Sequence, residues 1–219
     1  MKQLFDSKLF EGLGKVADCL IVSFFWLMCC LPVVTIGAAT TAMYYTVHKS
    51  IIGDREYVTR CFFTSFKDNF KQATICNLVL LAVLLILGVD AYIVYQMAVA
   101  GESSAFIFYF FLVAILYVIG WGCVLFPYMA RFQNTTKNTL KSAVFLEMRH
   151  LPTSIALIAS LILTVFLILY VPLCVLFMPA VLFLLYDFLL ERVFRKYMNE
   201  EDLARELEYK RQRNEDRRR

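Results

Sequence analysis

The positively charged residues of this chain are confined to a few short stretches. All 22 Lys and Arg residues lie within residues 2–15, 49–71, 131–149 and 192–219. The blocks between them, at 19–47, 72–89, 103–130 and 151–186, contain no charged side chain. Uncharged runs of about 18 residues or more are typical of helices that cross a lipid bilayer. The pattern therefore predicts an all-α polytopic membrane protein.

The overall composition makes a soluble domain the weaker interpretation. Apolar residues make up 60% of the chain and charged residues only 18%, whereas a soluble domain is about half apolar. Such a chain needs the lipid bilayer as its solvent.

The apolar blocks can be divided into individual spans, because a helix needs about 20 residues to cross the hydrocarbon core. Residues 12–52 and 151–190 are each too long for one crossing, and Pro32 and Pro172 divide them, since proline is not tolerated inside a helix. Residues 73–97 and 103–130 supply two more helices. The sequence predicts about six transmembrane helices in three hairpins. The arm at 32–52 is rich in Gly, Ala and Thr, which indicates close packing against neighbouring helices.

The basic stretches also predict the orientation. Lys and Arg near span ends stay on the cytoplasmic side, and three hairpins place all four stretches on that side, with both termini in the cytoplasm. The alternative has five spans, with residues 33–50 at the interface and the N-terminus outside. We expect one transmembrane helical bundle domain at 1–191, followed by a charged, helical cytoplasmic tail at 192–219.

A short amphipathic helix is expected between the second and third spans. Phe62, Phe66 and Phe70 recur every fourth residue, with Lys and Arg nearby. This spacing predicts a cytoplasmic interfacial helix whose aromatic stripe enters the headgroup boundary. In the alternative interpretation, the same Phe side chains pack under the bundle.

Charged groups at membrane depth are costly and are therefore candidates for function. Asp18 and Asp187 fall near span ends, so we expect them at the interface. Asp90 lies deeper and is the best candidate for an intramembrane polar site. Thr40, Thr41 and Tyr44 share a helical segment that could line the same path.

Sequence patterns for catalysis and metal binding are lacking. The chain has no nucleophile arrangement, no glycine-rich phosphate loop and no HExxH motif. Its seven Cys residues form no CxxC pair, and its two histidines, His48 and His150, lie at block edges. We therefore predict no enzyme, no cofactor and no metal site. Nucleic acid is not an expected partner, because membrane topology already accounts for the basic residues.

Three segments together resemble a known family. They are residues 31–44 (LPVVTIGAATTAMY), 65–74 (SFKDNFKQAT) and 127–132 (PYMARF), the last followed by Lys137-Asn138 and Leu151-Pro152. In this order they resemble the YesL family of bacterial integral membrane proteins. The resemblance implies a bacterial plasma membrane location and an association with ABC-type carbohydrate uptake systems.

Two functions follow as hypotheses. In the first, the protein is an accessory or interaction subunit of a carbohydrate transporter, and Arg131, Asn138 and Lys141 form its cytoplasmic contact with ABC transporter subunits. The loop at 131–152 is loosely similar to the ATPase-docking loop of sugar permeases, but lacks its Glu-Ala-Ala start and its glycine. The alternative is an autonomous small transporter or channel, a homo-oligomer that uses Asp90 together with Thr40, Thr41 and Tyr44.

Overall fold

The chain is almost entirely helical in the part that the structure describes. The computed structural model describes residues 2–53, 57–100 and 105–198, together with residues 204, 207, 208 and 211, and these contain no strand. The longer helices are α1 (Lys2–Cys30), α2 (Ile36–Thr46), α3 (Val58–Val99), α4 (Ala105–Arg131), α5 (Thr136–Arg149), α6 (Leu151–Tyr170) and α7 (Met178–Phe194). The shorter ones are the 3-10 turns η1 (Val33–Thr35) and η3 (Pro172–Leu176) and the π-helix η2 (Val47–Ile52). The all-α prediction is confirmed.

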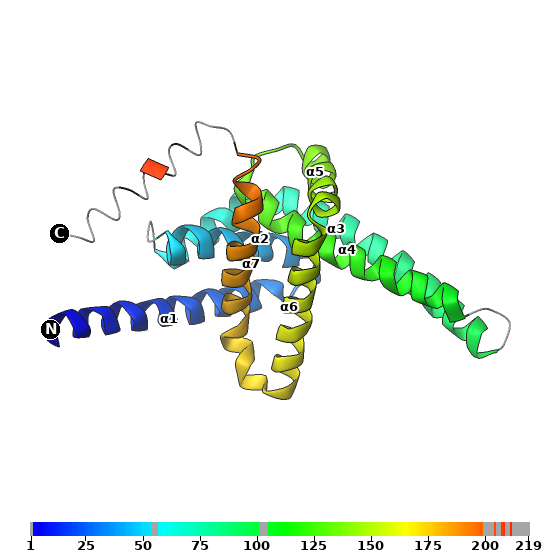
Figure 1. Cartoon of the computed structure of the whole chain (residues 1–219), viewed down its shortest axis with the longest axis horizontal. Helices are drawn as coiled ribbons and strands as arrows, with labels where there is room; N and C mark the ends of the chain where they lie inside the picture. The colour runs from blue at the N-terminus through cyan, green and yellow to red at the C-terminus, as the bar shows by residue number, and fades with distance from the viewer. Residues whose placement is uncertain are drawn as a thin grey trace.

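The helices pair as three hairpins, α1–α2, α3–α4 and α6–α7, and the two members of each pair pack against each other (Figure 1). Pro32 lies in the bend between α1 and α2, and Pro172 begins the turn between α6 and α7. These are the two breaks expected from the sequence: Pro32 precedes η1 and Pro172 is the first residue of η3, where the missing amide proton breaks no helical hydrogen bond.

The described helices differ in length and hydropathy. Four helical segments of the described chain are long and apolar enough to cross a bilayer: Gly12–Cys30, Val58–Val99, Phe106–Arg131 and Leu151–Tyr170. α7 has 17 residues, and α2 continued by η2 forms one helical segment at 36–52. Both lie near the lower end of the length that crosses a bilayer, about 17–25 residues. The fold is therefore that of a helical membrane protein with four long apolar helices and two shorter inner ones.

The expected short interfacial helix is not a separate element. It forms the first part of α3, which continues without interruption for 42 residues. At about 1.5 Å per residue this helix is about 63 Å long, twice the hydrocarbon thickness of about 30 Å. Phe62 is fully buried, Phe66 packs against the core, and Phe70 is 40% exposed. The alternative interpretation, with Phe side chains packing under the bundle, describes Phe62 and Phe66.

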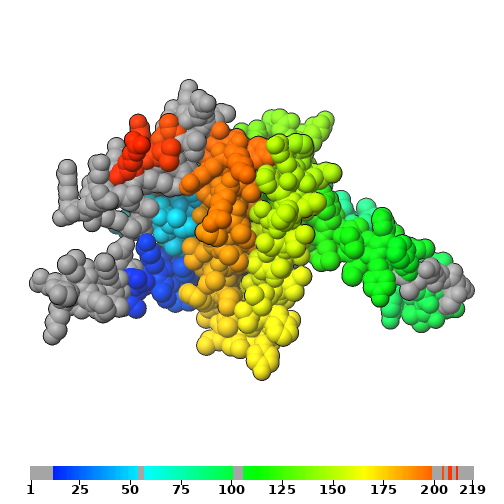
Figure 2. All heavy atoms as spheres, viewed as in Figure 1, coloured from blue at the N-terminus to red at the C-terminus, as the bar shows by residue number. Residues whose placement is uncertain are grey.

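The hairpins diverge from a shared centre. In Figure 1 the α3–α4 hairpin extends to one side, whereas the α6–α7 hairpin points in another direction. The outer part of α3–α4 stands clear of the other helices on the face drawn in Figure 2, and its apolar side chains are strongly exposed, among them Leu85, Phe106 and Phe110. Such a surface suits contact with lipid.

The core lies where the hairpins meet, around α2. Most of α2 is buried, and its small residues let it approach α3 and α4 closely. A Cβ atom on Gly37 would lie 2.6 Å from the ring of Phe126 and 2.8 Å from the carbonyl oxygen of Ala73. The side-chain amide of Asn77 donates to the carbonyl of Val33 at 2.9 Å. The expected close packing of this arm is therefore observed.

Candidate functional site

Four charged or titratable side chains meet in the core next to α2. Nδ1 of His48 lies 2.6 Å from Oδ1 of Asp187 and 3.8 Å from Oε2 of Glu191. Nη2 of Arg131 lies 2.7 Å from Oε1 of Glu191. The side chains are only 7% to 18% exposed. We call His48, Arg131, Asp187 and Glu191 the ionic cluster.

Three elements bring the ionic cluster together. Asp187 and Glu191 are one helical turn apart on α7, which places both carboxylates on one face. Arg131 is the last residue of α4, and His48 lies in the π-helix that extends α2. π-helical turns occur frequently at functional sites, because they move a side chain out of the regular register.

Tyr44 borders the ionic cluster from α2. Its ring stacks on His48 with an angle of 4° between the ring planes and packs edge-on against Phe194. The side chain is fully buried, and its hydroxyl interacts electrostatically with Asp187 and Glu191. Tyr44 therefore holds the imidazole of His48 and presents a polar atom to the carboxylates.

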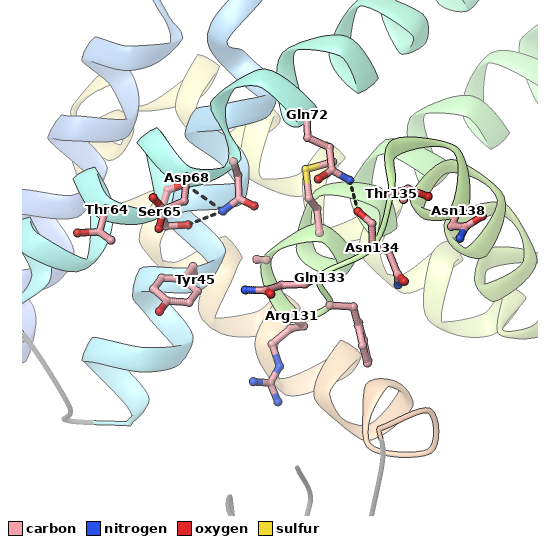
Figure 3. Close-up of a pocket in the computed structure, with 14 residues that line it drawn as sticks. Tyr45, Thr64, Ser65, Asp68, Gln72, Arg131, Gln133, Asn134, Thr135 and Asn138 are labelled. Carbon is pink, nitrogen blue, oxygen red and sulfur yellow. Dashed lines mark hydrogen bonds between the residues drawn. The ribbon is translucent and has the colours of Figure 1, made fainter. Parts of the chain in front are cut away.

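A polar pocket lies beside the ionic cluster, and Arg131 lines both. The pocket has a volume of about 750 Å³ and is bounded by the first half of α3, the end of α4, the α4–α5 connection and Tyr45 (Figure 3). We call it the loop-side pocket. Most of its lining side chains are uncharged but polar: Thr64, Ser65, Asn69, Gln72, Gln133, Asn134, Thr135 and Asn138.

Hydrogen bonds hold the wall of the loop-side pocket in place. Nε2 of Gln72 on α3 donates to the carbonyl of Asn134 at 2.9 Å and to Oγ1 of Thr139 at 3.0 Å. The amide of Asn134 in turn donates to the hydroxyl of Tyr128 at 3.0 Å. The α4–α5 connection is thus fixed to both α3 and α4, so the pocket is a preformed cavity.

The three residues expected to contact a partner have different surroundings. Asn138 is exposed and lines the loop-side pocket. Lys141 is exposed and lines a smaller cavity of about 290 Å³ with Tyr128 and Tyr197. Arg131 also reaches the loop-side pocket, but its guanidinium pairs with Glu191 in the core. Arg131 is therefore mainly a structural residue.

The residues expected to line an intramembrane path do not come together within one chain. Thr41 donates to the carbonyl of Gly37 at 2.9 Å, and Thr40 accepts from Nε1 of Trp26 at 3.5 Å. Asn77 of α3 lies beside the start of α2. Asp90 is 13 residues further along α3, which places it about 20 Å from Asn77 at about 1.5 Å per residue. Tyr44 faces the ionic cluster instead of Asp90.

A second buried carboxylate, Glu147, lies where α5 packs on α4. It is 1% exposed, and its carboxylate occupies the space that a side chain at Gly120 would need. Its Oε2 atom and Oγ of Ser154 make no hydrogen bond. Burial disfavours the charged form, which raises the pKa of Glu147 to about 7.

The sequence analysis missed the ionic cluster and Glu147. Asp187 was expected at the interface, yet it is 5% exposed inside the protein, because His48 and the end of α4 cover it. The four-residue spacing of Asp187 and Glu191 in an apolar helix was the available signal. No local pattern links either residue to His48, which is 139 positions away from Asp187.

Comparison with known protein families gives a match over part of the chain. Residues 19–91 match the family model described as "Protein of unknown function, DUF624", which is the model of the YesL family. The resemblance to the YesL family is thereby confirmed, and the matched segment contains the last part of α1, all of α2 and most of α3. No curated protein and no solved structure matches the chain.

Proposed function

We propose that this chain is an accessory subunit of an ABC-type carbohydrate uptake system in the bacterial plasma membrane. In this proposal the loop-side pocket receives a segment of a transporter subunit or of the ATPase. The observation that carries the proposal is the pocket itself, a preformed polar cavity on a membrane protein. The resemblance to the YesL family supplies the kind of partner.

The chemistry of the pocket supports binding of a peptide segment. Its volume of about 750 Å³ falls within the usual range for binding sites, about 300–1,000 Å³. The amides of Gln133 and Asn138 can donate and accept hydrogen bonds, as a peptide backbone requires. Asp68 adds a negative charge to the lining, whereas the charge of Arg131 is paired with Glu191. The pocket is thus suited to a polar segment of mixed character.

The orientation in the membrane is part of the proposal. The loop-side pocket is formed by residues of the basic stretches 49–71 and 131–149, together with their neighbours. The positive-inside rule favours a cytoplasmic location for both stretches. The pocket would then face the compartment that contains the ATPase, and both termini would lie in the same compartment.

Site-specific photocrosslinking tests the proposal. A photoreactive amino acid replaces Asn138, which lines the pocket, and in a second strain replaces Met148, which is 63% exposed on the same helix but lies outside the pocket. After irradiation of intact cells, we expect a crosslinked transporter subunit or ATPase from position 138 and none from position 148.

Purification in a gentle detergent gives a second test, which can contradict the accessory function. If the protein is recovered alone, with no transporter subunit or ATPase enriched over an untagged control, and position 138 gives no crosslink, the accessory function is wrong. Cysteine labelling from outside the cell at an introduced Asn138→Cys tests the orientation separately, since a cytoplasmic residue is protected from impermeant reagents.

A further inference from the structure

Three potential metal ligands converge in the ionic cluster. Nδ1 of His48 and one carboxylate oxygen each of Asp187 and Glu191 lie within 4.8 Å of one another. Ligands at about 2.1 Å from a tetrahedral Zn²⁺ are about 3.4 Å apart, so the observed separations of 2.6 Å and 3.8 Å from His48 lie on either side of that value. One imidazole and two carboxylates form a donor set that first-row divalent ions accept.

Two buried polar atoms at this site have no hydrogen-bond partner. One is Oε2 of Glu191, on a side chain that is 10% exposed, and the other is the hydroxyl of Tyr44, which is fully buried. A buried polar atom without a partner costs about 1–3 kcal/mol. Both atoms border the same group of carboxylates. A cation bound there would satisfy Oε2 of Glu191 and would lie close to the Tyr44 hydroxyl.

The neighbouring side chains already orient the ligands. Arg131 binds Oε1 of Glu191 and leaves Oε2 directed toward His48. The ring of Tyr44 stacks on the imidazole. Groups that hold metal ligands in this way are a regular part of protein metal sites. The carboxylates of Asp187 and Glu191 lie near the buried guanidinium of Arg131, and a second guanidinium, that of Arg195, lies 3.7 Å from Glu191 and is 42% exposed.

We propose that His48, Asp187 and Glu191 bind one divalent transition-metal ion, with Zn²⁺ as the ion that best fits the donors. Three protein ligands leave one coordination position of a tetrahedral ion for a water molecule or a further ligand. The bound ion would link α2 to α7, the two short inner helices, and would thereby stabilise the centre of the fold.

Metal titration of the purified full-length chain tests this proposal. The protein carries an affinity tag without histidine, is stripped with a chelator in detergent, and is titrated with Zn²⁺ in a calorimeter. We expect one ion per chain. We expect His48→Ala and Glu191→Gln each to weaken binding at least tenfold, whereas Glu147→Gln, which alters a buried carboxylate outside the cluster, leaves it unchanged.

A measurement on the unsubstituted chain keeps the test decisive if a variant does not fold. Co²⁺ bound by nitrogen and oxygen ligands in a tetrahedral site absorbs visible light, so the absorption should saturate at one equivalent and disappear when Zn²⁺ is added. Absence of stoichiometric binding by the unsubstituted chain would overturn the proposal. Folded His48→Ala and Glu191→Gln proteins that bind as tightly as the unsubstituted chain would also overturn it. Either test is independent of any transporter partner, so its failure leaves the proposed accessory function standing.

Discussion

The guanidinium of Arg131 lies 2.7 Å from Oε1 of Glu191, and the two side chains are 16% and 10% exposed. This ion pair joins the end of α4 to α7 in the interior of the protein. An isolated buried charge is far more costly than a buried pair, because the lost solvation of each ion is then not offset by its partner. The pair therefore makes the core sensitive to changes at either residue.

Replacement of Arg131 by methionine should destabilise the protein strongly. Arg131→Met removes the nearer and more buried of the two guanidiniums at Glu191, since that of Arg195 lies 3.7 Å away and is 42% exposed. Breaking a buried pair costs about 3–5 kcal/mol. The measurement is the free energy of unfolding in detergent with a chelator present. The double variant Arg131→Met/Glu191→Leu should recover much of the loss, because no unpaired charge remains.

The exposed residue Lys141 provides the control for this prediction. Lys141→Met removes an exposed cation from the neighbouring helix α5 without breaking a buried pair, so we expect a change of no more than about 0.5 kcal/mol. Equal losses of unfolding free energy in Lys141→Met and Arg131→Met would contradict a specific role of the buried pair.

Gly37→Ala should force α2 away from α3. The added methyl group would lie 2.6 Å from Phe126, 2.8 Å from the carbonyl oxygen of Ala73 and 2.9 Å from Cβ of Asn77. Overpacking of this kind costs about 1–3 kcal/mol, measured as a lower unfolding temperature. Gly88→Ala on α3 is the matched control, since no atom lies within 4 Å of its Cβ position; it should stabilise the helix by about 0.5–1 kcal/mol. A Gly37→Ala variant with an unchanged unfolding temperature would contradict the close approach of α2 and α3.

Substitution along the Phe stripe distinguishes packing from insertion into the headgroup region. Phe62 is fully buried, so Phe62→Ala should cost about 3–5 kcal/mol of unfolding free energy in detergent. Phe70 is 40% exposed, and Phe70→Ala should cost on the order of 1 kcal/mol. The opposite order, or equal losses, would favour a stripe that serves only to contact lipid.

Glu147 should make stability depend on pH. Burial raises the pKa of Glu147 from 4.5 to about 7. Between pH 4.5 and pH 7, the folded state therefore holds a proton that the unfolded state has lost. The folded state is therefore most favoured below about pH 4.5 and loses stability as the pH rises through 7, by roughly 3 kcal/mol in total.

Thermal unfolding of Glu147→Gln between pH 5 and 8 checks this prediction. The amide cannot ionise, so the variant should be more stable than the unsubstituted protein above pH 7, and the difference should shrink toward pH 5. Asp68→Asn, at an exposed residue of α3, should keep the original pH dependence. An unchanged profile in Glu147→Gln would show that Glu147 is already charged in the folded protein.

Two turns and the class of fold could be derived from local sequence. The uncharged blocks indicate membrane helices, since a charge in hydrocarbon is costly whatever its neighbours are. Pro32 and Pro172 mark the bends of two hairpins because proline lacks the amide proton of a helical residue. The break that was expected before residue 73 is absent, and α3 is one continuous helix. Residues 58–87 contain no proline or glycine, so nothing in this segment interrupts the helix.

The sequence by itself thus determined that this protein is an all-helical membrane protein with helical hairpins at predictable positions, because charge and proline act locally. Only the tertiary structure decided that His48 meets Asp187, that Arg131 turns inward to Glu191, and that Glu147 is buried on α4. These contacts join residues on different helices, and their partners are chosen by how α2, α4, α5 and α7 pack. Helical periodicity gives the face on which a residue lies, but it does not identify the helix that covers that face.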